Sequence, residues 1–107
     1  MTQGPYRTDL LKNIVEVTVK AAEIENFKAF MIEYLPATAA FSGCEFVYLM
    51  RALSDSQKFF FFETWESLER LNAYHAWRGQ NKLLAQMFEA PPKVRRGWGI
   101  FPAPPPK

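Results

Sequence analysis

Three side chains of this sequence have types and spacing that suit acid–base chemistry beside an aromatic ring: Glu63, Trp65 and His75. Glu63 and Trp65 are two residues apart in a segment typical of a β-strand, so their side chains share one face of a sheet. His75 lies on the apolar stripe of the helix predicted to follow that strand. Because a strand, a turn and a helix pack against each other, the imidazole, with an ordinary pKa of about 6.5, would reach the same cleft.

Several neighbouring side chains are candidates to complete this cleft. They are Phe61 on the same strand, Tyr48 and Arg51 on the strand before it, and Asn72 and Tyr74 on the helix. Arg51, or Arg78 further along the helix, could stabilise an oxyanion. The same residues also suit a purely structural interpretation, in which Trp65 is a core residue, His75 is hydrogen-bonded and Glu63 pairs with an arginine.

The sequence has few of the residues that metal and cofactor sites require. Cys44 is the single cysteine and His75 the single histidine, so one chain alone cannot form a disulfide, a thiolate cluster or a multi-histidine site. Glycine-rich phosphate loops and the HExxH motif are absent. A net charge of +2 does not favour nucleic acid, and the basic residues Lys93, Arg95 and Arg96 are predicted to form a solvated edge. We therefore expect no cofactor, no metal and no nucleic-acid partner.

The spacing of apolar residues predicts the main elements of the fold. Alternation indicates strands at 14–20, 44–52, 59–65 and 94–101, and a three-to-four-residue period indicates helices at 23–36 and from Ser67, the second interrupted at Gly79. Pro36 is expected to end or kink the first helix. The order β-α-β-β-α-β predicts an α+β fold of the ferredoxin-like type, with a four-stranded antiparallel sheet and both helices on one face.

The rest of the chain is expected to lie outside one compact domain. That domain would span residues 13–101, between a flexible N-terminal arm at 1–12 and a proline-rich tail at 102–107. The first residues lack the apolar segment of a signal peptide, and no stretch approaches the roughly 18–20 apolar residues of a membrane span. We expect a cytoplasmic protein with no membrane partner.

The two middle strands are apolar on both faces. Cys44, Phe46, Tyr48 and Met50 are expected on one face of the second strand, and Leu49 on the other. Because the helices can cover only one face of the sheet, the other would expose large apolar side chains. The simplest cover is the same face of a second copy, so the pattern predicts a homodimer.

These segments also resemble the antibiotic biosynthesis monooxygenase (ABM) domain family. The resemblance rests on the runs at 41–44 (FSGC) and 62–71 (FETWESLERL), followed by His75. In that family a Gly-Cys pair opens the second strand, an E-x-W pair closes the third, and a histidine follows one helix later. The resemblance covers about residues 13–101 and implies the dimeric α+β barrel fold.

The resemblance also implies an activity. The protein would be a small monooxygenase that oxidises an electron-rich aromatic substrate of the quinol or phenol type with O2, using neither flavin nor metal. Trp65 and Phe61 would stack on the substrate, and His75 would take or return a phenolic proton.

Other activities remain open at this point. Heme-degrading members of the family use an Asn in the first strand, a Trp in the third and a His in the following helix. Trp65 and His75 match two of these, whereas the predicted register places Ile14 rather than Asn13 at the third position. The family also contains an isomerase of small phosphorylated hydroxyketones. A non-enzymatic module that binds a small ligand on the same fold is a further alternative.

Overall fold

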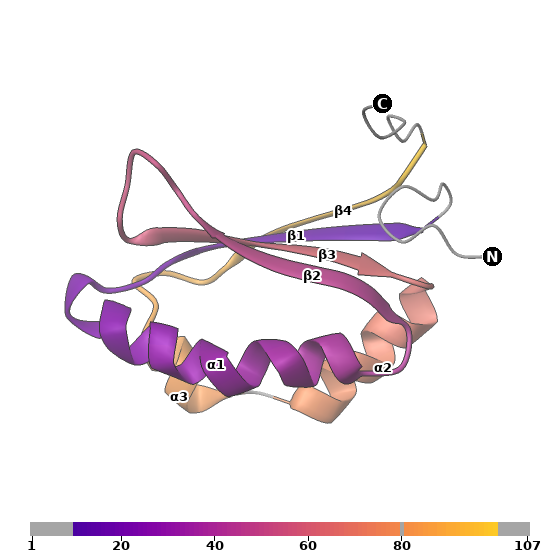
Figure 1. Ribbon diagram of the computed structural model, residues 1–107, viewed down its shortest axis with the longest axis horizontal. Helices are drawn as coiled ribbons and strands as arrows, with labels where there is room; N and C mark the ends of the chain where they lie inside the picture. The colour runs from indigo at the N-terminus through magenta and orange to yellow at the C-terminus, as the bar shows by residue number, and fades with distance from the viewer. Residues whose placement is uncertain (1–9, 80, 101–107) are drawn as a thin grey trace.

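The computed structural model describes residues 10–79 and 81–100. Its elements, in chain order, are β1 (Leu11–Thr18), η2 (Ala21–Glu23), α1 (Ile24–Ala40), β2 (Cys44–Arg51), β3 (Lys58–Trp65), α2 (Leu68–Arg78), α3 (Lys82–Gln86) and β4 (Lys93–Trp98). The four strands form one antiparallel sheet in the order β2-β3-β1-β4, with all three α-helices on one side of it (Figure 1). The predicted ferredoxin-like α+β fold is confirmed.

The strand register decides which side chains face the helices, the side that we call the inner face. In the pairing of β1 with β3, Asn13 lies opposite Glu63 and Leu11 opposite Trp65. On the other side of β1, Arg96 of the edge strand β4 also lies opposite Asn13. Because side chains alternate along a strand, these five residues all belong to the inner face. The outer face carries the residues between them.

A β-bulge changes the predicted facing of β2. Cys44 pairs with Trp65, but Phe46 pairs with Thr64, so the register shifts by one residue between Cys44 and Phe46. A bulge places an extra residue on one strand and reverses the facing beyond it. The expectation that Cys44 shares a face with Phe46 was therefore wrong: Cys44 packs inward beside Trp65, whereas Phe46 lies on the outer face with Tyr48.

Pro36 does not end α1, which continues to Ala40. Proline lacks the N–H that would bond to the carbonyl of Ile32, but both residues lie on the exposed side of the helix, where water can satisfy that carbonyl. Ser67 begins α2 as predicted, because its hydroxyl accepts a hydrogen bond from the backbone N–H of Arg70.

The first strand begins earlier than the sequence pattern indicated. β1 starts at Leu11 rather than Ile14, and Leu10 and Leu11 are buried, so residues 10–12 are part of the fold and not of an arm. The remainder of the predicted arm, and the tail at 102–107, lie outside the described residues. Within the described part of the chain, no helix is long and apolar enough to span a bilayer.

The core divides into two clusters between the sheet and the helices. The larger contains Val17, Phe27, Phe59 and Phe61 among its buried members, and the smaller is built around Trp65 with Leu11, Leu71 and Tyr74. Between them, the inner face holds the buried polar residues Asn13 and Glu63.

Candidate functional site

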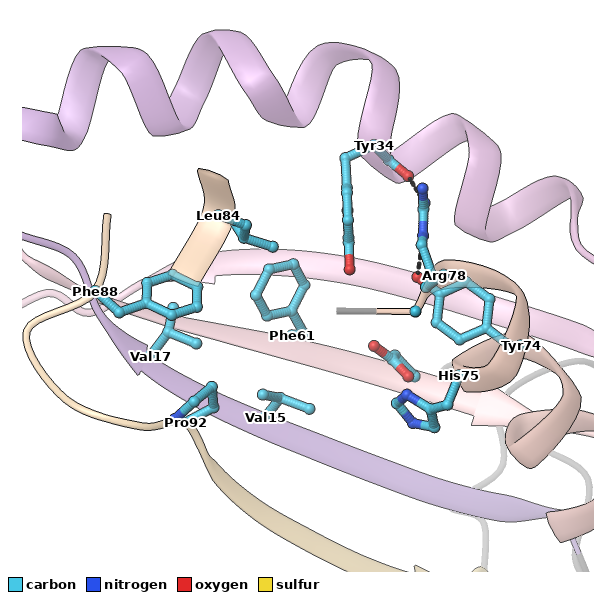
Figure 2. A pocket seen from close by; sticks show the side chains of 12 residues that line it. Val15, Val17, Tyr34, Phe61, Tyr74, His75, Arg78, Leu84, Phe88 and Pro92 are labelled. Atoms are coloured by element: carbon cyan, nitrogen blue, oxygen red, sulfur yellow. Dashed lines mark hydrogen bonds between the residues drawn. The ribbon is translucent and has the colours of Figure 1, made fainter. Parts of the chain in front are cut away.

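A cavity of about 160 Å³ lies between the inner face of the sheet and the three helices (Figure 2). Its wall is formed by Val15, Val17, Tyr34, Phe61, Glu63, Tyr74, His75, Arg78, Gly79, Leu84, Phe88 and Pro92. Most of this wall is apolar or aromatic, and the polar groups gather where β3 meets α2. Such a cavity suits a flat apolar ligand with one polar end.

Glu63 is the buried carboxylate of this cavity, with 8% of its surface exposed. Its Oε1 accepts two hydrogen bonds, one from Asn13 Nδ2 at 3.0 Å and one from the indole Nε1 of Trp65 at 2.9 Å. Burying a charge is costly unless such donors compensate for lost water. Asn13 and Trp65, each with 0% exposure and neither of them part of the cavity wall, therefore hold the carboxylate in place.

His75 lies at the partly exposed end of the cavity, on α2. Its Nε2 lies 3.3 Å from Nη2 of Arg96, which crosses from β4. Burial lowers the pKa of His75 below its ordinary 6.5, the positive charge of Arg96 lowers it further, and the negative charge of Glu63 acts in the opposite direction. The imidazole is therefore mostly neutral at pH 7.

A second polar cluster links α1 to α2 at the cavity wall. Arg78 donates to the hydroxyl of Tyr74 at 2.9 Å, the carbonyl of Tyr34 at 2.7 Å and the hydroxyl of Thr38 at 2.9 Å. Its guanidinium also lies 3.8 Å from the ring centroid of Tyr34, a cation–π contact. Tyr34 extends from α1 toward the strands with its hydroxyl inside the cavity region (Figure 2). Burial raises the pKa of Tyr34 far above its ordinary value, and the adjacent Tyr74 adds to this, so the phenol keeps its proton.

The structure brings together five of the predicted site residues, among them Arg78, the second of the two arginines expected to stabilise an oxyanion. Phe61, Glu63, Tyr74, His75 and Arg78 all line the cavity. Trp65 does not line it: its ring is fully buried against Tyr74, with centroids 4.9 Å apart. The predicted role of Trp65 as a stacking platform therefore has no support in this geometry, whereas Phe61, the other predicted stacking residue, does line the wall.

The other three predicted residues lie away from the cavity. Tyr48 is on the outer face of the sheet and 57% exposed. Arg51, at the end of β2, donates to the backbone carbonyl of Ser56 at 2.7 Å, and Asn72 is exposed on α2. Tyr48 is excluded from the cavity by its position in β2. It pairs with Phe62 on the outer face of the sheet, whereas the next residue, Leu49, pairs with Phe61 on the inner face.

Sequence reasoning missed the functional setting of Asn13, Tyr34 and Arg96. Asn13 interrupts a row of inward-facing apolar residues, Leu11, Val15 and Val17. This interruption could have been used to predict a buried polar group at position 13. The predicted register, which placed Ile14 on the face of Trp65, was wrong by one residue. Arg96 could not be identified in this way, because its contact with His75 depends on how β4 pairs with β1.

No group of three or more His, Cys, Asp or Glu side chains in the described ranges is arranged to hold a metal ion. The polar groups of the cavity, a carboxylate, a neutral imidazole, two phenols and a guanidinium, instead suit proton transfer and hydrogen bonding to a hydroxylated ring.

Fold and cavity together define a single-domain ferredoxin-like α+β protein with an aromatic-lined cavity that is partly open to solvent. The family model of the antibiotic biosynthesis monooxygenases matches residues 11–85. The chain therefore belongs to the antibiotic biosynthesis monooxygenase family.

Solved structures show the same fold at low sequence identity. A candidate antibiotic biosynthesis monooxygenase of Nitrosomonas europaea superposes with a TM-score of 0.79 at 18% identity, covering 92% of this chain and 98% of that one. A candidate of the same class from Bordetella bronchiseptica gives 0.70 at 21% identity, with 87% and 99% covered. A conserved protein of Methanosarcina mazei gives 0.76 at 14% identity, with 84% and 92% covered. No match was found among curated proteins.

Proposed function

We propose that this protein is a small monooxygenase that oxidises an electron-rich, single-ring aromatic substrate of the quinol or phenol type with O2 and without a bound cofactor. The observation that carries the proposal is the cavity, whose aromatic and aliphatic wall ends in Glu63, His75 and the Tyr34 hydroxyl. Family membership supports the reaction class. The size supports the substrate class, because a cavity of about 150 Å³ holds one benzene ring, and this one measures about 160 Å³.

The chemistry needs only what the substrate and the cavity supply. A dihydroxybenzene and O2 give a hydroxyquinone and water: one oxygen atom enters the ring, the other leaves as water, and the substrate provides all four electrons. A phenolic O–H first loses its proton, and the anion then transfers an electron to O2. The substrate radical and the superoxide so formed combine through a new C–O bond to give a peroxide. This peroxide takes up a proton and loses water. The protein contributes desolvation, orientation and proton transfer.

Oxygen uptake tests this proposal. Dihydroxybenzenes should consume O2 above the spontaneous rate when the protein is added without any cofactor. Val15→Phe, which places a ring inside the cavity, should abolish most of this rate, whereas Ala29→Phe on the exposed side of α1 should not. Absence of turnover across quinols, anthrones and phenols, combined with saturable binding of catechol, would instead support the non-enzymatic binding module.

The heme-degrading alternative gains one observation from the structure. Asn13 does share the inner face with Trp65, contrary to the predicted register. However, both side chains are fully buried and donate to Glu63, so neither is free to contact a heme. Titration with hemin should therefore give no saturating one-to-one shift of the Soret band. A tight shift that is lost in His75→Ala would support heme binding.

We also propose that the protein acts as a homodimer through the outer face of the sheet. Phe46, Tyr48 and Met50 are 38%, 57% and 40% exposed there, beside the half-buried Phe60 and Phe62. All three helices lie on the opposite side (Figure 1). A second copy presents the same apolar surface and can cover this one by twofold symmetry.

A further inference from the structure

Arg96 joins two parts of the site that the sequence does not connect. Its Nε donates to Oδ1 of Asn13 at 3.1 Å, and its Nη2 lies 3.3 Å from Nε2 of His75. Arg96 itself is exposed and belongs to the basic run predicted to be a solvated edge. The register of β4 places it on the inner face, opposite Asn13, whereas its neighbour Arg95 lies opposite Ile14 on the outer face.

The contact with Arg96 fixes the protonation of His75. A guanidinium has five N–H donors, has no acceptor and keeps its charge at every relevant pH. Nε2 of His75 must therefore accept this hydrogen bond, which means that it carries no proton. In the neutral ring the single proton is then on Nδ1. The lone pair on Nε2 already accepts from Arg96, so the Nδ1–H is the group left to contact a ligand, and it is a donor.

The same arginine also fixes the orientation of Asn13 and, through it, Glu63. Because Asn13 Oδ1 accepts from Arg96, its Nδ2 points to the carboxylate of Glu63. The flipped amide would place N–H groups against the guanidinium and an oxygen against the carboxylate, which are both repulsive. Asn13 and Trp65 both donate to Oε1, and within the described residues no hydrogen bond reaches Oε2. Glu63 lines the cavity, so Oε2 remains to meet a ligand hydroxyl.

We propose that Glu63 is the base of the reaction and that Arg96 is a positioning residue that makes His75 a hydrogen-bond donor; this assignment rests on the proposed function. The phenolic O–H bond breaks, the proton goes to Oε2 of Glu63, and the electron pair stays on the substrate oxygen. The Nδ1–H of His75 stabilises the phenolate so formed. The other polar groups around the imidazole are the Tyr74 phenol and, further along the wall, Arg78 and Tyr34, none of which is an anion that competes with Glu63.

The role of Arg96 can be tested by NMR without any turnover. His75 is the only histidine of the chain, so the two ring nitrogens of 15N-labelled protein give an unambiguous signal. The wild-type spectrum at pH 8 should show the Nδ1–H tautomer, which is the minor form of histidine in water. Arg96→Met should shift it to the Nε2–H tautomer, and the matched outer-face control Arg95→Met should leave it unchanged. An Nε2–H wild-type ring, or a tautomer insensitive to Arg96→Met, would overturn the positioning role.

Kinetics test which group is the base. With a dihydroxybenzene substrate, Glu63→Gln should lower kcat by about 10²–10⁴-fold. His75→Gln, whose amide can still donate, should lower it by only about 10-fold. Arg96→Lys should restore part of what Arg96→Met loses, since an ammonium can donate to His75 or Asn13 but lacks the fork that reaches both. The larger loss in His75→Gln, with Glu63→Gln near wild type, would overturn the assignment.

The two experiments separate this inference from the proposed function. If the wild-type protein turns over no phenol or quinol, the proposed function fails and the base assignment fails with it. The tautomer measured by NMR still decides the role of Arg96 in that case, because it depends only on the folded protein.

Discussion

The two faces of β3 carry the same aromatic residues but different polar ones. Phe59 and Phe61 point inward and are 4% and 6% exposed, whereas Phe60 and Phe62 point outward and are only half-buried. The inner row continues into Glu63, a carboxylate with two hydrogen-bond donors. On the outer face, the charged pair Glu16–Lys58, with 3.6 Å between its charged atoms, lies near the rim and is partly exposed.

This difference separates a surface that packs from a surface that can do chemistry. Apolar area alone stabilises whatever covers it, at about 25 cal/mol per Å², and it does not specify a reaction. Burying a polar group costs free energy unless hydrogen bonds compensate for the lost water. Here Asn13 and Trp65 donate to the buried carboxylate of Glu63, and Arg96 donates to Asn13. The inner face therefore carries the proposed site, and the outer face the proposed interface.

The largest expected effect comes from a charge introduced on the inner face. Leu49 packs against the larger core cluster, so Leu49→Lys should lower the free energy of unfolding by about 2–4 kcal/mol. Its neighbour Tyr48 faces outward, and Tyr48→Lys should leave the protomer folded. Urea unfolding of both variants at one protein concentration checks this. Because Tyr48 also lies in the proposed interface, the comparison is made at a concentration at which light scattering shows both variants to be monomers, and equal destabilisation there would show that the facing of β2 is not as described.

The next largest effect concerns the outer face and the proposed dimer. Light scattering should give twice the protomer mass for the wild-type protein at micromolar concentration. Phe62→Lys, at the centre of the apolar outer face, should weaken the dimer by about 2 kcal/mol or more, the loss typical of a central interface residue. Ile32→Lys, on the exposed side of α1, is the matched control and should remain dimeric. A wild-type monomer would refute the dimer.

The fold was predictable from the sequence because its signals are local. Alternation, helical periodicity, the Ser67 cap and the Gly79 break each depend on a few neighbouring residues, and their order alone indicates the ferredoxin-like fold. The ends of β1 and α1 were not predictable in the same way. The burial of Leu11 depends on contact with Trp65, and the helix passes Pro36 because the missing bond faces water.

The site was predictable only in part because its contacts are not local. Glu63 and His75 were identified from their spacing along one strand and the next helix. Trp65 was identified as well, but its burial behind Glu63 follows from the packing of Tyr74. Arg96 acts across the sheet, 21 residues from His75 along the chain, and no pattern near either residue indicates that contact.

A smaller effect should follow from removing the indole N–H behind the carboxylate. Trp65→Phe keeps an aromatic ring in the core but loses the hydrogen bond to Glu63, so the free energy of unfolding should fall by about 1.5–3 kcal/mol. Trp98→Phe, at an exposed position of β4, is the matched control and should cost less than about 0.5 kcal/mol. Urea unfolding measures both. Equal stability of the two variants would show that the buried hydrogen bond contributes little.

The smallest expected effect is a pH dependence of the free energy of unfolding that comes from His75 on the inner-face side of the molecule. Burial and Arg96 lower the pKa of His75 in the folded state below the value of about 6.5 in the unfolded chain. As the pH falls below 6.5, the unfolded chain therefore binds more protons than the folded one, and the free energy of unfolding decreases until the folded-state pKa is passed. Urea unfolding of the wild-type protein and His75→Gln between pH 8 and pH 5 isolates this contribution, because the carboxylates common to both proteins cancel in the difference. The stability of the wild-type protein relative to the variant should be constant above about pH 7 and should decrease below it; an increase toward low pH would mean that the attraction of Glu63 outweighs burial and Arg96.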